Sequence, residues 1–173
     1  NTFDAILSDG ERVDSYRRMM LSFSSHLLVR PEADGSWDDR HLKEALRSGR
    51  LYGVFEMLGY AQGFDYYAQA DGIFEMGDEV ALEDAPELWV QQPVVRQLDL
   101  LQEAPLLSTR IVRATSDTWV EVAQSSGDLR YRPTEPGAYR AEVRMRPRHL
   151  RTALADYDQR STEGDLVWVY ANP

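Results

Sequence analysis

The chain of 173 residues contains no cysteine, which excludes disulfide bonds, thiol catalysis and zinc sites built from thiolates. It also has no run of about 18 apolar residues, so the sequence offers no membrane-spanning helix. The two glycine-rich phosphate-binding motifs are missing, and so is the Gly-x-Ser-x-Gly turn that presents the nucleophile of many serine hydrolases. The most recognisable nucleotide-binding and esterase sites are therefore excluded.

Basic residues are also scarce. The chain has 19 Lys and Arg against 29 Asp and Glu, which gives a formal net charge of −10. An acidic surface repels phosphate backbones, so a nucleic-acid partner is not expected. The single basic run comprises Arg140, Arg144, Arg146, Arg148 and Arg151. We interpret it as the solvated face of one strand and of the residues directly after that strand, with an anion-facing or partner-facing patch as the alternative.

What the chain does have is a globular composition, with 43% hydrophobic residues and nine Tyr. Its clearest pattern runs from Tyr139 to Arg146, where apolar and charged residues alternate strictly. Only a strand places successive side chains on opposite faces, so this stretch predicts a sheet with one dry and one solvated face. The Pro136-Gly137 pair before it predicts a turn.

The first fifty residues have a helical period. One stripe comprises Tyr16, Met19, Met20, Phe23 and Leu27. A second, shorter helix is expected after Ser36, with acidic residues in its first turn and Gly49 as its stop. Its predicted buried side consists of Leu42, Ala45 and Leu46.

From Leu51 the period changes to two. Strands are expected at 51–58, 64–68, 73–76, 88–90, 111–114, 119–123, 129–132, 139–145 and 166–170. Asp71-Gly72 predicts a hairpin with a type I′ turn. The segment 93–105 is interpreted as a long connection, and Pro147 as the start of a short helix. The fold expected is mainly β, an immunoglobulin-like antiparallel sandwich at 51–173 preceded by a helical segment at 1–50.

Candidate metal ligands are few. Asp38 and His41 are three residues apart on a predicted helix and could face one ion, although this spacing is common on surface helices. His26 is interpreted as a core or interface residue, or as a partner of a helix C-terminus. His149 lies in a polar turn and is expected to be solvated.

Two further groups offer chemistry. Glu75, Asp78 and Glu79 lie near a strand end and could form an acid/base pair or bind calcium, but a solvated loop would have the same composition. The aromatic strand containing Tyr67 could form a sugar-stacking platform. Alternation places Phe64 and Tyr66 on one face and Tyr67 on the other, which favours a core with one exposed ring.

An ordered series of short stretches resembles one family. The stretches are DGER at 9–12, DSYRRMM at 14–20, FSSHLL at 23–28, ALRSGR at 45–50, GFDYYA at 63–68, EMGDE at 75–79, GAYRAEV at 137–143 and WVYANP at 168–173. Together they are similar to the C-terminal portion of bacterial proteins of the polymerase-and-histidinol-phosphatase (PHP) superfamily, predicted metal-dependent phosphoesterases.

This resemblance implies that a metal-binding α/β barrel precedes the chain and that residues 1–50 are its helical tail and linker. The family's metal-ligand motifs would then lie upstream of Asn1, so no residue here is assigned as a catalytic residue or a metal ligand. Divalent metal ions are implied for the absent catalytic domain. The residues expected to face the barrel are Asp9, Arg12, Tyr16, Arg17, Met19, Met20, Phe23 and His26.

The function expected is therefore that of a non-catalytic accessory module that packs on or gates its own upstream barrel. Without the barrel, the apolar stripe could also promote self-association. A glycan- or cell-envelope-binding module, with exposed aromatic surface around Tyr67 and Trp89, is the alternative. A third possibility is an enzyme that uses Glu75, Asp78 and Glu79. Cytoplasm and periplasm both remain open as locations.

Overall fold

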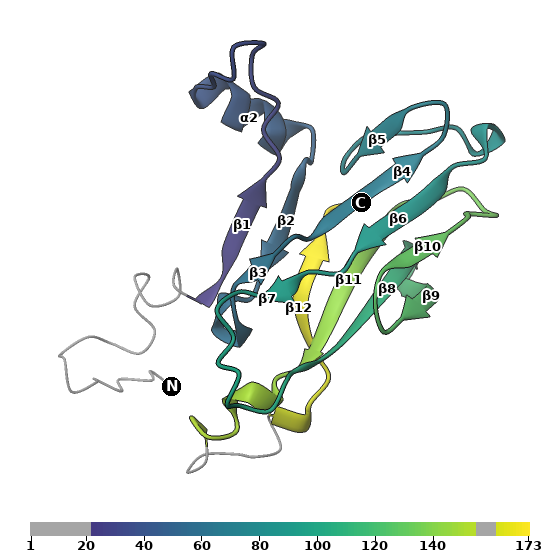
Figure 1. Ribbon diagram of the computed structural model, residues 1–173. Coiled ribbons are helices and arrows are strands. Elements are labelled where there is room, and N and C mark those ends of the chain that lie inside the picture. Colours follow the sequence, from purple (N-terminus) through teal and green to yellow (C-terminus); the bar gives the residue numbers. More distant parts are fainter. Residues whose placement is uncertain (1–21, 155–161) are drawn as a thin grey trace, which may run out of the picture.

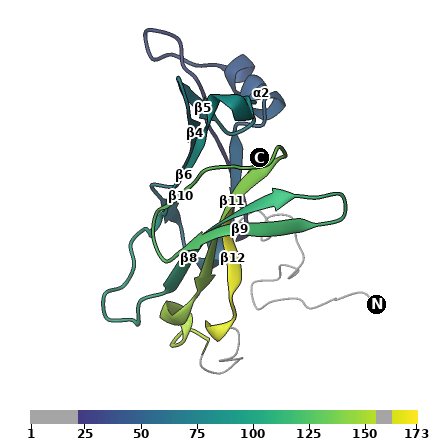
Figure 2. The same ribbon diagram turned by 90° about the vertical axis from the view of Figure 1, so that its right-hand side faces the viewer.

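The computed structural model describes residues 22–154 and 162–173, and these form two antiparallel sheets that pack face to face (Figures 1 and 2). The larger sheet has the strand order β1 (Ser24–Leu27), β2 (Leu51–Val54), β12 (Leu166–Ala171), β11 (Tyr139–Arg146), β8 (Leu106–Ala114) and β9 (Trp119–Ser125). The smaller sheet has the order β10 (Leu129–Tyr131), β6 (Glu87–Gln91), β4 (Asp65–Gln69) and β5 (Ile73–Glu75). The mainly β, antiparallel prediction is confirmed.

Short elements connect the sheets. β3 (Ala61–Gln62) and β7 (Val94–Val95) form a separate two-stranded pair. The helices are α2 (Asp39–Arg47) and the single-turn 3₁₀ elements η1 (Glu56–Leu58), η2 (Leu82–Asp84) and η3 (Arg148–Leu150). The long connection predicted at 93–105 is present and contains β7, and the short helix predicted after Pro147 is η3.

The core lies between the two sheets. Ala141, Val143 and Met145 of β11 are fully buried, as the alternation of that strand predicted. Trp168 of β12 is also fully buried, and its indole Nε1 donates to the Gly59 carbonyl at 2.8 Å. A buried indole therefore keeps its hydrogen bond while its rings fill the core.

The sequence predicted that the charged face of β11 is solvated, but part of this face is buried. Glu142 is only 2% exposed and accepts hydrogen bonds from Arg110 and Arg140, each at 2.6 Å. Burial alone would raise the pKa of Glu142, but the two guanidiniums outweigh it and lower that pKa. Arg144 completes the layer through Asp165 at 2.6 Å. Arg110, Arg140 and Arg144 therefore form ion pairs within the protein and are not free to bind an anion.

The predicted N-terminal helix stripe is wrong over its last residues. Residues 24–27 form β1, which pairs with β2 in the register Ser24↔Val54 to Leu27↔Leu51. Pairing with an existing sheet overrides the local helical period. The other stripe positions, Tyr16, Met19 and Met20, lie outside the described residues.

The strand predicted at 51–58 is also too long. β2 ends at Val54 and η1 follows, although the Phe55 amide still donates to the Trp168 carbonyl of β12 at 2.9 Å. The hairpin between β4 and β5 is confirmed, with Gln69 opposite Ile73. Neither Asp71 nor Gly72 has a positive φ, so its turn is not type I′.

The helix α2 begins at Asp39, with Asp38 as its cap rather than in its first turn, and it buries less than predicted. Asp38 and His41 form a capping box at its start, and Ala45 is fully buried. Leu46, predicted to be buried, is 53% exposed. The helix lies at the end of β1 and β2 (Figure 1), and among its residues only Ala45 is fully buried, while His41 and Leu42 are partly covered.

His149 is another residue whose surroundings differ from the expectation of a solvated turn. Its Nε2 lies 3.0 Å from the Leu58 carbonyl, which joins η3 to η1, and its Nδ1 is buried without a described partner. Burial lowers the pKa of His149, because the charged imidazolium would lose its water.

Three segments meet tightly at Gly77. Its amide donates to the Pro173 carbonyl at 3.0 Å, and a Cβ added there would overlap the Ser48 carbonyl oxygen. Its φ is +83°, in the left-handed region that favours glycine. Gly77 therefore holds the β5 end against the end of α2 and the end of β12.

We predict that Gly77→Ala destabilises the protein by about 3 kcal/mol or more, because a left-handed backbone and a backbone overlap are both penalised. Gly35 provides a matched control, since its φ is +82° and an added Cβ would meet nothing within 4 Å. Gly35→Ala should cost only about 1 kcal/mol. Equal losses in urea-unfolding experiments would show that the junction is not tightly packed.

A second prediction concerns pH. With a folded-state pKa below the unfolded value of about 6.5, His149 binds more protons when the chain is unfolded. The free energy of unfolding should therefore fall as the pH is lowered through about 6.5, and be restored above it. His149→Gln keeps an N–H donor for Leu58 and should flatten this part of the curve. Parallel curves for the two proteins between pH 8 and pH 5.5 would contradict the assignment.

Candidate functional site

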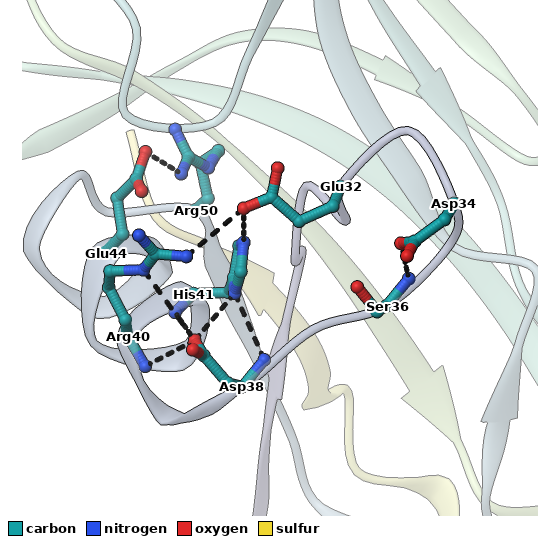
Figure 3. A network of polar contacts seen from close by, with 8 residues as sticks. All are labelled: Glu32, Asp34, Ser36, Asp38, Arg40, His41, Glu44 and Arg50. Carbon is teal, nitrogen blue, oxygen red and sulfur yellow. Dashed lines mark hydrogen bonds and ion pairs between the residues drawn. The ribbon is translucent and has the colours of Figure 1, made fainter.

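The Asp38–His41 pair lies in a polar network at the start of α2 (Figure 3). The Asp38 carboxylate accepts from the backbone amides of Arg40 at 2.9 Å and His41 at 3.3 Å, and the Asp38 amide donates to His41 Nδ1 at 3.1 Å. On the other side of the ring, His41 Nε2 is 3.2 Å from Glu32. Both residues are thus occupied in capping the helix.

This network does not converge on one point that a metal could occupy. Asp38 and Glu32 contact opposite nitrogens of the His41 ring, so the two carboxylates and the imidazole cannot share a single ion. Arg40 also places its guanidinium 3.1 Å from Glu32. Across residues 22–154 and 162–173, no group of three or more His, Cys, Asp or Glu is arranged to hold a metal.

The carboxylates at 75–79 form a structured turn. Arg30 donates to Glu75 at 2.8 Å and reaches Asp78 at 3.4 Å, while Asp78 also accepts from the Glu75 amide at 3.0 Å. Within the described part of the chain, Glu79 is exposed and has no hydrogen bond or ion pair. Two of the three carboxylates therefore share one guanidinium, which does not resemble an acid/base pair poised on a substrate.

A pocket of about 450 Å³ opens behind this turn. Its walls come from β4, β5 and β6 of the smaller sheet and from the loop that leads into β11. Two of its lining residues link the sheets, because the buried Tyr66 hydroxyl donates to the Tyr139 carbonyl at 3.1 Å. Burial raises the pKa of Tyr66, so its phenol stays protonated. The sequence could not predict this pocket because its walls are far apart along the chain.

Of the residues expected to face a barrel, only Phe23 and His26 are described; Asp9, Arg12, Tyr16, Arg17, Met19 and Met20 lie outside the described residues. Phe23 packs with its ring centroid 5.2 Å from Phe55 and 6.1 Å from Tyr170. It lies over Gly53, where an added Cβ would be 2.7 Å from the Phe23 ring. We call Phe23, Phe55 and Tyr170 the Phe23 patch.

His26 lies on the opposite face of the larger sheet. Its ring stacks on Tyr52 at 4.7 Å, and Tyr52 and Gly53 are neighbours in a strand, so they point to opposite faces. His26 Nε2 is 3.0 Å from Ser24 Oγ and 3.3 Å from Glu56, and Ser24 donates to Glu56 at 2.5 Å. Sequence reasoning missed Ser24 and Glu56 because Glu56 joins from a separate element.

The Ser24–His26–Glu56 cluster is not a catalytic triad. In a triad the serine and the acid contact different imidazole nitrogens, so that the acid orients the ring while the other nitrogen takes the proton. Here both contact Nε2, and the serine hydroxyl donates directly to the carboxylate. The cluster therefore anchors the edge strand β1 to η1.

The aromatic residues of the smaller sheet form a row across its outer face. Tyr67, Trp89 and Arg130 are in register on β4, β6 and β10. The Tyr67 and Trp89 rings stack at 5.9 Å, and the Arg130 guanidinium carbon lies 3.5 Å from the Trp89 ring centroid. A sugar would need the Trp89 ring face that Arg130 covers, which weighs against a stacking platform.

Within the described residues, no helix combines the length and the apolar character needed to cross a membrane. Comparison with protein-family models, curated proteins and solved structures found no match to this chain.

Proposed function

We propose that this chain is a non-catalytic β-sandwich module that packs on or gates the catalytic barrel of a PHP-type metal-dependent phosphoester hydrolase. The proposal starts from the ordered series of stretches that resemble the family. In such an enzyme, divalent metal ions activate water and clamp the phosphate oxygens. The residues of this chain would contribute a docking face and no metal ligand.

The observation that carries the proposal is the Phe23 patch. Phe23 is among the first described residues, and it lies on the outer face of the larger sheet beside Tyr170, which is still 36% exposed. The chain that enters at this point carries the apolar residues Tyr16, Met19 and Met20. A domain attached through that segment would approach this face first, and the patch would extend its apolar contact.

We further infer that the sandwich is immunoglobulin-like. Tyr139 at the start of β11 donates through its hydroxyl to the Glu135 carbonyl at 2.5 Å, four residues upstream. This resembles the tyrosine corner of immunoglobulin-like domains, in which a tyrosine near the start of a core strand bonds back to the preceding loop. The two face-to-face antiparallel sheets also support this assignment.

A matched pair of proteins tests the docking face: this chain and a longer protein extended upstream through the expected barrel. Tyr170→Ala should destabilise the longer protein by about 1–2 kcal/mol more than it destabilises the chain alone, because the ring loses an additional apolar contact. The unfolding free energy in urea measures both losses.

Ile73→Ala serves as the control, since Ile73 is 65% exposed and lies on β5 of the smaller sheet, whereas the Phe23 patch lies on the larger sheet. It should change the two proteins equally. The longer protein should also hydrolyse a generic phosphodiester with added manganese or zinc, while this chain should not. Turnover by the chain alone, or equal losses for Tyr170→Ala in both proteins, would refute the proposal.

A further inference from the structure

The pocket behind the turn at 75–79 has the size and lining of a small-molecule site, and the proposed docking function does not use it. Ligand pockets usually measure roughly 300–1,000 Å³, and this one measures about 450 Å³. Phe74, Met76 and Leu88 supply apolar wall, and Met76 and Leu88 are buried members of the core. The wall is therefore formed by side chains that packing already holds in place.

Tyr66 and Tyr139 add aromatic side chains to this lining, and their hydroxyls are already used within the protein. The Tyr66 hydroxyl is used by the Tyr139 carbonyl, and the Tyr139 hydroxyl is used by the Glu135 carbonyl. Neither hydroxyl is therefore free, which leaves the aromatic rings of these two lining residues for an occupant. Aromatic rings attract cations through their negative faces.

The charge of the lining has one sign. Glu75, Asp78, Glu79 and Glu135 line the pocket, and no Lys, Arg or His does. Arg30 pairs with the first two from outside, and Arg113 pairs with Glu135. Four carboxylates thus face two guanidiniums, which leaves a surplus of about two negative charges beside apolar wall.

The turn at 75–79 already binds one guanidinium, that of Arg30. Arg30 donates to one Glu75 oxygen through both Nε, at 3.1 Å, and Nη2, at 2.8 Å. The geometry of the turn is fixed in advance, because Asp78 accepts from the Glu75 amide and Gly77 is held by the Pro173 carbonyl. A site that is organised before binding loses less conformational entropy when a ligand binds, so the ligand binds more tightly.

We propose that this pocket binds an organic cation, a guanidinium or amine carried on an apolar stem. The stem packs against the Phe74 and Leu88 wall, and the cationic head lies near Glu79, whose charge is uncompensated within the described part of the chain. Such a head occurs on the arginine side chain of a peptide and on a free alkylguanidine. The site is independent of the barrel and of the Phe23 patch.

Calorimetric titration of the intact chain at low salt and pH 7 tests this with three probes: acetyl-Ala-Arg-Ala-amide, the same peptide with citrulline in place of arginine, and free agmatine. The citrulline peptide is uncharged and should bind at least about tenfold more weakly than the arginine peptide. Added salt should weaken binding of the cationic probes. Binding of the arginine peptide alone identifies a peptide source, and comparable binding of agmatine identifies a free small cation.

Variants locate the site. Glu79→Gln should weaken cation binding about three- to fivefold, the range expected for a partly exposed ion pair. Glu83→Gln is the matched control: it removes the same charge from an exposed glutamate that does not line the pocket. Leu82→Ala trims an apolar lining residue that is already partly exposed, so the fold should tolerate it while affinity falls.

Three results would overturn the proposal. They are equal binding of the arginine and citrulline peptides, failure of both cationic probes to bind at millimolar concentration, and equal losses for Glu79→Gln and Glu83→Gln. The Tyr170 comparison tests the outer face of the larger sheet, whereas the pocket lies against the smaller sheet. Either proposal can therefore fail without the other.

Discussion

The meeting of three chain segments at Gly77 is the constraint on which the rest of the structure depends. The end of α2, the turn after β5 and the end of β12 approach so closely there that only a hydrogen atom fits in place of a side chain. This contact joins the smaller sheet to the larger one beyond their shared core. It also fixes the carboxylate turn, and with it the rim of the pocket, relative to the wall that comes from β6 and the loop before β11.

The two sheets present different chemistry outward. The larger sheet carries a layer of arginines neutralised around the buried Glu142, with the aromatic Phe23 patch toward its β1 edge. A neutralised ionic layer contributes little attraction to a partner, because its charges already have partners. The Phe23 patch beside the ionic layer is thus the part of this face that can contribute to binding a partner. The pocket's acidic surplus lies at the junction of the sheets, so the two proposed interactions do not compete for surface.

The sequence predicted elements well wherever one local pattern decided them. β11 follows from strict alternation, and α2 follows from the acidic start after Ser36 and the stop at Gly49. The Asp38–His41 spacing suggested a metal but is explained by capping. Prediction failed where distant partners decide: β1 is a strand because β2 pairs with it, and Glu142 is buried because Arg110 reaches it from β8. His149 is covered through Leu58, which is 91 residues away. The pocket depends on the same kind of long-range assembly, so no window of sequence could reveal it.

The position of β1 has a practical consequence for cutting the protein into pieces. β1 is an edge strand, and it covers β2, whose Gly53 has no side chain and is shielded by Phe23. A piece that began at Leu51 would lose both covers and leave β2 as a bare, flat edge. Bare edges add strands from neighbouring molecules and lead to aggregation. A soluble version of the sandwich therefore has to retain the chain from Phe23 onward, although the local period of that stretch is helical.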